Sequence, residues 1–168
     1  EPTGASRTLG GFRAFAESVD GGDEQFVILD TAPTGHTVLL LEAAESYDRE
    51  IRRSAGHTPE PVRRLLPRLR DPNFTKILLV THAEATPVAE AERLQADLRR
   101  AGIEPFGWVV NQSLLASGTR DAQLQHRAAA QLPFVRRVAE DLSERTALIP
   151  WLTEVPVGPE RLAALLRA

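Results

Sequence analysis

The strongest chemical signal in the sequence is a polar, glycine-containing loop that directly follows a short apolar run. Phe26–Leu29 is rich in β-forming residues, which predicts a strand buried on both faces, as in a parallel sheet. Asp30 stands at the carboxyl end of that strand. A carboxylate fixed there suits the holding of a Mg²⁺-bound water beside a phosphate, in the manner of a Walker-B motif. A turn residue is the alternative interpretation of Asp30, because strands often end in Asp.

The loop after Asp30 has the composition of an anion-binding turn. Thr31–Gly35 is small, hydroxylated and contains one glycine, and an amphipathic helical pattern begins near Val38. Backbone N–H groups and the dipole of that helix would therefore face an anion. Gly35 would let the backbone approach a γ-phosphate closely, because glycine has no side chain.

Alternating strand and helix patterns predict the elements that position this loop. We expect one α/β domain over residues 1–168, with a helix and lead-in over 1–25 and an α/β core over 26–168, built as a parallel sheet with flanking helices. Thr86 and Pro87 predict a helix start, and Gly102 predicts its left-handed cap. The predicted strands are 26–29, 76–81, 106–110 and 147–149. The predicted helices are 12–19, 38–56, 60–69 with an interruption at Pro67, 86–101, 120–142 with a break or kink at Pro133, and 162–166.

Composition excludes several functions. The chain has no Cys, so it has no disulfide, no thiolate nucleophile and no cysteine metal site. Its four His residues lack metal-site spacing. A net charge of −3 with mixed signs gives no field for nucleic acid or anionic lipid. Apolar runs such as Val38–Leu41 are far too short to cross a membrane. We expect a cytoplasmic protein without nucleic-acid binding or direct membrane insertion, and the absence of Met predicts a piece of a longer chain.

The eight residues Asp30–Thr37, Asp-Thr-Ala-Pro-Thr-Gly-His-Thr, resemble the signature of the ArsA family, the arsenical pump-driving ATPases and their relatives that target tail-anchored membrane proteins. Residues 81–91 and 98–114 are also similar to segments of that family, as are residues 150–151 and 156–158 together with Leu162. The resemblance covers nearly the whole chain from Phe26 onward. It implies the C-terminal portion of a deviant P-loop ATPase, a partial Rossmann-like fold that lacks its N-terminal P-loop unit.

The resemblance also implies roles for individual residues. Asp30 would be the Walker-B carboxylate that reaches Mg²⁺ through water, within a switch II segment that ends at Thr37. Thr34 and Gly35 would contact ATP, with the Gly35 N–H directed at the γ-phosphate. Asn111 would read adenine, because its amide offers both a donor and an acceptor to a purine edge.

Other matching positions retain two interpretations. Pro156 and Val157 would line the adenine pocket or serve in packing, and His36 would sense nucleotide or stabilise its loop. Asn111 itself could be an ordinary strand-end turn residue. His82 follows a predicted strand, but we expect no functional role for it.

The sequence lacks the loop that grips phosphate in such ATPases. Its single lysine, Lys76, follows Thr75 at a predicted strand start, and no glycine precedes a lysine. We therefore expect a chain that is inactive alone, within a parent that uses Mg-ATP to export an anion such as arsenite. The expected partners are a second ATPase module, as a tandem half or a homodimer, and a membrane transporter. The alternatives are a non-catalytic regulatory or partner-binding module and, less favoured, a small doubly wound domain with an unrelated ligand.

Overall fold

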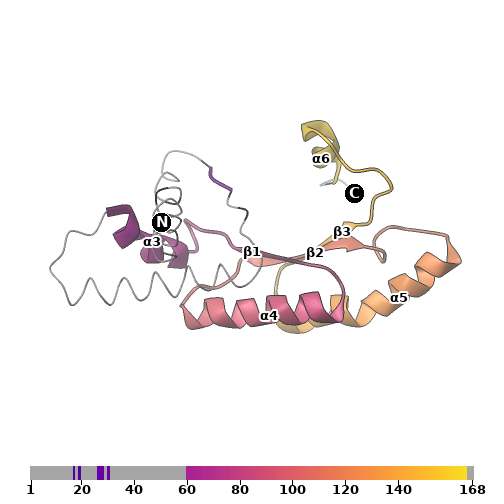
Figure 1. The fold of residues 1–168 in the computed structure, drawn as a ribbon, viewed down its shortest axis with the longest axis horizontal. Helices are drawn as coiled ribbons and strands as arrows, with labels where there is room; N and C mark the ends of the chain where they lie inside the picture. The colour runs from indigo at the N-terminus through magenta and orange to yellow at the C-terminus, as the bar shows by residue number, and fades with distance from the viewer. Residues whose placement is uncertain (1–16, 18, 20–25, 29, 31–59, 166–168) are drawn as a thin grey trace, which may run out of the picture. The chain divides into compact units, whose positions relative to one another are not determined.

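The computed structural model describes residues 17, 19, 26–28, 30 and 60–165, with only the backbone of Pro61 and Val62 (Figure 1). These residues fall into two compact units. The first holds the described residues up to Lys76 together with Ala96–Glu104, and the second holds Ile77–Gln95 and the residues from Pro105 onward.

The second unit is built on a three-stranded parallel sheet. Strands β1 (Leu78–Thr81), β2 (Gly107–Ser113) and β3 (Thr146–Pro150) lie in the order β1-β2-β3. In the register of the sheet, Val80 faces Val109 and Val109 faces Ala147. The parallel α/β sheet predicted from the sequence is confirmed, and its strands coincide with three of the predicted runs.

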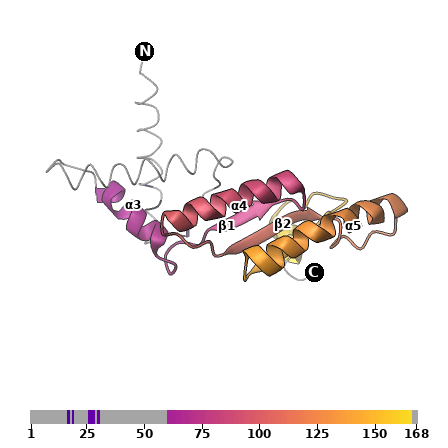
Figure 2. The same ribbon diagram turned by 90° about the horizontal axis from the view of Figure 1, so that it is seen from below.

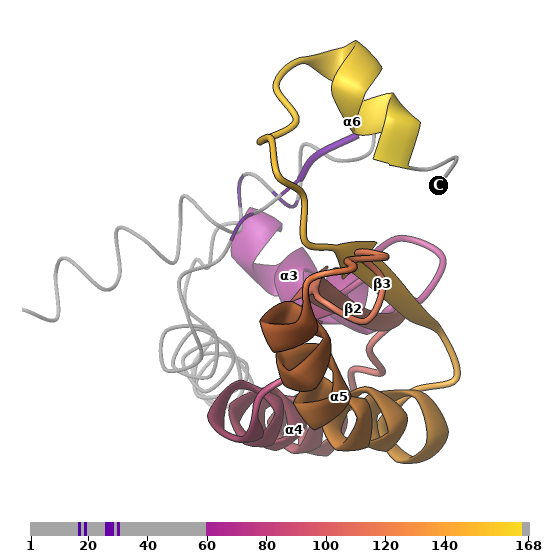
Figure 3. The same cartoon turned by 90° about the vertical axis from the view of Figure 1, so that its right-hand side faces the viewer.

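Two helices cover one face of this sheet. Helices α4 (Ala85–Arg100) and α5 (Ala122–Arg136) lie on the same side of the strands (Figures 2 and 3). Leu79 and Trp108 share that side and are buried, whereas Leu78 and Val80 point the other way and are 53% and 62% exposed. Because parallel sheets usually have both faces covered, this exposed apolar face is a notable feature of the unit.

Helix α5 begins with a side-chain cap and passes through its proline. The Leu124 N–H donates to Asp121 Oδ1 at 2.9 Å, which satisfies one of the free donors at the helix start. Pro133 does not break the helix, which instead widens into a π-helical segment, η2 (Arg137–Leu142). The predicted helical extent to residue 142 is confirmed, and the break is wrong. A last short helix, α6 (Pro159–Leu165), has no buried residue.

The ends of α4 follow the sequence signals only in part. The helix begins at Ala85, so Thr86 is not its cap, and Pro87 lies in the first turn, where a missing N–H costs little. Gly102 has φ of +77° and closes the helix as predicted. Its N–H donates to Arg99 O at 3.0 Å and the Ile103 N–H donates to Leu98 O at 2.9 Å, the pair of bonds that defines a Schellman cap.

The first unit contains helix α3 (Glu60–Arg70), which was predicted, but the interruption expected at Pro67 is wrong because the helix continues through that residue. The predicted buried strand over 26–29 is wrong for the residues described. Residues 26–28 belong to no strand, and Phe26 and Ile28 are 93% and 80% exposed. Among the described residues the three strands pair only with one another, so nothing there supplies the hydrogen bonds that a strand requires. Glu17 and Val19 are helical, as expected, and the helix predicted over 38–56 lies outside the described residues.

Candidate functional site

Asn111 lies inside β2, not at its end as the sequence predicted. Strand β2 pairs Val110 with Leu148 and Ser113 with Pro150, so three steps on β2 oppose two on β3. This is a β-bulge, which inserts one extra residue and shifts the side-chain alternation. Val110 and Ser113 are both buried as a result, while Asn111 is half-buried and Gln112 is exposed.

The bulge fixes the surroundings of the Asn111 side chain. The Gln112 N–H donates to Asn111 Oδ1 at 3.0 Å, and Gln112 has φ of +53°, in the left-handed region. Beyond the bulge, the Leu114 N–H donates to Gln131 Oε1 at 2.8 Å, which ties the end of the strand to α5. The Asn111 carboxamide thus lies on a bulge, and hydrogen bonds hold both its own oxygen and the strand residues that follow it. The bulge is near the carboxyl end of a parallel strand, where ligands bind in sheets of this class.

The C-terminal loop starts beside this bulge. The Trp151 N–H donates to Ser113 O at 3.0 Å, which joins the end of β3 to the end of β2. Pro156 is half-buried and Val157 is 74% exposed. No hydrogen bond among the described residues links Pro156 or Val157 to Asn111, so their predicted place in one pocket stays a prediction.

Asp30 is the only member of the predicted phosphate-side site that the structure describes. It is exposed, belongs to no strand and lies in the first unit. Thr34, Gly35 and His36 lie outside the described residues. An exposed carboxylate suits Mg²⁺, which prefers oxygen ligands and retains several waters. Within the described ranges no three His, Cys, Asp or Glu side chains cluster, so one carboxylate and water are what these residues could supply.

His82 lies near a strand end and has a simple environment. His82 is exposed just after β1, and its C=O accepts a hydrogen bond from Thr81 Oγ1 at 3.2 Å.

Gln95, in helix α4, was not predicted as a notable residue from the sequence, although it is buried. Its Nε2 donates to Leu142 O at 2.8 Å and its Oε1 accepts from Trp108 Nε1. The available signal was its position seven residues after Val88, on the apolar stripe of α4.

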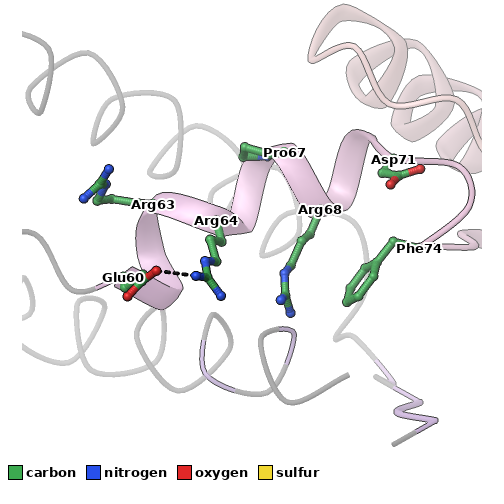
Figure 4. A pocket seen from close by; sticks show the side chains of 7 residues that line it. All are labelled: Glu60, Arg63, Arg64, Pro67, Arg68, Asp71 and Phe74. Atoms are coloured by element: carbon green, nitrogen blue, oxygen red, sulfur yellow. Dashed lines mark hydrogen bonds and ion pairs between the residues drawn. The ribbon is translucent and has the colours of Figure 1, made fainter. Parts of the chain in front are cut away.

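A cavity of about 430 Å³ lies on α3 in the first unit, but it involves none of the predicted site residues. Arg64 pairs with Glu60 across one helical turn, and the Arg68 guanidinium lies 4.7 Å from the Phe74 ring centroid (Figure 4). The charged groups of Glu60, Arg64 and Arg68 therefore contact other residues of this segment, as in an ordinary surface helix. The lining residues are Glu60, Arg63, Arg64, Pro67, Arg68, Asp71 and Phe74.

Among the residues that the structure describes, the clear pKa shifts come from surface ion pairs. Hydrogen bonds from Arg99 lower the pKa of Glu104, against a smaller opposing effect of burial. The pKa of Arg137 is raised by its hydrogen bond to Asp141 and its proximity to Glu92. These pairs lie on exposed surfaces, where water screens them and each contributes little to the free energy of folding.

Comparison with known proteins places these features in context. The sequence matches the anion-transporting ATPase family over residues 8–58 and 54–167. It is 46% identical to the arsenical pump-driving ATPase of Acidiphilium multivorum and 45% identical to that of Escherichia coli, in each case over 92% of this chain and 26% of the relative. It is 25% identical to the ATPase GET3 of Malassezia globosa, over 92% of this chain and 57% of that protein.

The chain therefore spans about a quarter of the length of the arsenical pump-driving relatives. Within the part that the structure describes, no helix combines the length and apolar character that a membrane crossing requires.

Proposed function

Because the chain belongs to the anion-transporting ATPase family, we propose that it is the C-terminal part of an ATPase module in a longer cytoplasmic protein. That protein would couple the binding and hydrolysis of Mg-ATP to the export of an anion such as arsenite. The observation that carries the proposal is the identity of about 45% with arsenical pump-driving ATPases over 92% of the chain. The parallel sheet, with Asn111 held near a strand's carboxyl end, is compatible with a nucleotide site.

In this proposal the site residues divide between the two ends of the nucleotide. Asp30 holds Mg²⁺ through water, and Thr34 and Gly35 contact the γ-phosphate. Asn111 reads the adenine edge, and Pro156 and Val157 pack against the base. Bound Mg²⁺ would neutralise charge on the phosphates during transfer.

The proposal requires partners that supply what this sequence lacks. No glycine here precedes a lysine, so the phosphate-gripping loop comes from another part of the protein. A second ATPase module, as a tandem half or a homodimer, and a membrane transporter complete the assembly. Residues 1–168 would form one structural module within it.

A non-catalytic, partner-binding module is the second candidate. The observation that favours it is the apolar sheet face at Leu78 and Val80, which the described helices leave exposed. Exposed apolar patches of this kind often mark an interaction surface.

Hydrolysis assays test the proposal and separate it from the non-catalytic candidate. The protein expressed from its own gene should hydrolyse Mg-ATP, and Asp30→Asn should reduce turnover by orders of magnitude without changing its circular dichroism spectrum. Asp141→Asn, a surface carboxylate on η2, is the matched control and should retain turnover within about twofold. Residues 1–168 alone should show no hydrolysis above a blank. Full activity in Asp30→Asn would remove Asp30 from the site, and an inactive natural protein would favour the non-catalytic candidate.

A further inference from the structure

The bulge in β2 carries two local features that the sheet itself does not need. Gln112 is the one non-glycine residue with positive φ among those the structure describes. Side chains other than glycine enter this region at a cost, because Cβ crowds the following carbonyl oxygen. The next residue, Ser113, is fully buried, and its hydroxyl has no hydrogen-bond partner within the described part of the chain. Unfavourable features of this kind cluster at functional sites, where the surrounding structure maintains them.

The bulge changes where consecutive side chains lie. In an uninterrupted strand, Gln112 would share the buried face of Val110, two residues earlier. The extra residue instead leaves both Asn111 and Gln112 off that face and buries Ser113. The left-handed turn of Gln112 also brings its N–H to Asn111 Oδ1, at 3.0 Å. The bulge therefore moves Gln112 off the buried face, beside the half-buried Asn111, and its N–H holds the Asn111 carboxamide by its oxygen.

We propose that Gln112 is a positioning residue whose backbone N–H fixes the carboxamide of Asn111 in the orientation that selects adenine over guanine. This inference rests on the proposed role of Asn111 in nucleotide binding. A flipped carboxamide would set Asn111 Nδ2 against the Gln112 N–H, two donors facing each other, so the oxygen stays toward the backbone. The side chain then retains Nδ2 as a donor and one lone pair of Oδ1 as an acceptor.

This pair of groups matches adenine. An asparagine amide bonds adenine in two places, donating to N7 and accepting from the N6 amino group. Guanine carries the acceptor O6 where adenine has N6, so a fixed Oδ1 would meet a second acceptor. Selectivity in this scheme depends on the backbone conformation of Gln112 and not on its side chain.

Three substitutions at position 112 test the scheme in the protein expressed from its own gene, with ADP and GDP titrated by calorimetry. Gln112→Gly and Gln112→Asn both accept positive φ and keep the N–H, so the ratio of the two dissociation constants should stay within about twofold of wild type. Gln112→Val disfavours positive φ, because its side chain branches at Cβ, and should reduce the preference for ADP by about fivefold or more. Gln123→Val, at an exposed glutamine on α5, is the matched control and should leave the ratio unchanged.

The outcomes separate this inference from the function on which it rests. Loss of selectivity in Gln112→Gly would assign the effect to the side chain and overturn the inference, whether or not the valine variant folds. Unchanged selectivity in a folded Gln112→Val would overturn it as well. Unchanged selectivity in Asn111→Ala would refute the role of Asn111 itself, and a wild-type protein that binds neither nucleotide would refute both proposals.

Discussion

Replacement of Gln95 by leucine should destabilise the sheet-bearing unit by about 2–6 kcal/mol. Gln95 is 3% exposed and joins three elements. Its Nε2 donates to Leu142 O at 2.8 Å at the end of η2, and its Oε1 accepts the indole N–H of Trp108 in β2. Leucine fills a similar volume but leaves the Leu142 carbonyl and the Trp108 N–H buried without partners. Each such orphan costs about 1–3 kcal/mol, which gives the range above.

Urea unfolding followed by far-ultraviolet circular dichroism measures this effect. Gln123→Leu, at an exposed position of α5, is the matched control and should change the free energy of unfolding by less than about 0.5 kcal/mol. Trp108→Phe removes the indole donor, so Gln95→Leu should cost less in that background, with a coupling of about 1 kcal/mol or more. A loss below about 0.5 kcal/mol for Gln95→Leu, or strict additivity in the double variant, would refute the buried network.

Three further predictions follow from separate contacts. Asn111→Ala should weaken adenine nucleotides more than inorganic phosphate in calorimetric titrations, and equal losses would argue against base reading. Gly102→Ala should lower the free energy of unfolding by about 1–2 kcal/mol, because φ is +77° and the new Cβ would lie 3.3 Å from Arg70 Nε; an unchanged urea midpoint would contradict this. Glu104→Gln should cost less than about 1 kcal/mol at neutral pH, since its pair with Arg99 is largely exposed. The folded-state pKa of Glu104 is lowered, so its contribution is present above the ordinary glutamate pKa of about 4.3 and is lost as the pH falls through the lower folded value. A wild-type advantage over Glu104→Gln that persists in strong acid would disprove this assignment.

The sequence predicts best those features that depend on nearby residues. The runs that form β1 and β3 are continuous and apolar, which is the pattern of strands in a parallel sheet. Gly102 ends α4 because the required backbone conformation is a local property that glycine meets most easily. The start of α4 was displaced by one residue because a proline fits several positions in the first turn.

Features set by distant partners are not visible in the pattern. Nothing in Val110–Ser113 reveals that β3 offers one residue opposite two of β2, so the extension of β2 through a bulge could not be predicted. Gln95 breaks an apolar stripe, but its burial depends on an indole 13 residues away and a carbonyl 47 residues away. The site residues Thr34 and Gly35 remain predictions of the sequence alone.

The strand expected over 26–29 shows what the apolar pattern can and cannot specify. Its composition suits a strand with both faces buried, yet Phe26 and Ile28 are exposed and unpaired within the described residues. Composition determines which surface a strand can bury, whereas its hydrogen bonds must come from a neighbour. Strand β1 likewise ends the described sheet and exposes Leu78 and Val80. Both segments therefore have the apolar composition of interior strands, yet among the described residues neither is flanked by a strand on each side. Within the described residues, the apolar composition of each segment therefore does not identify the strand or helix that would pair with it or cover it.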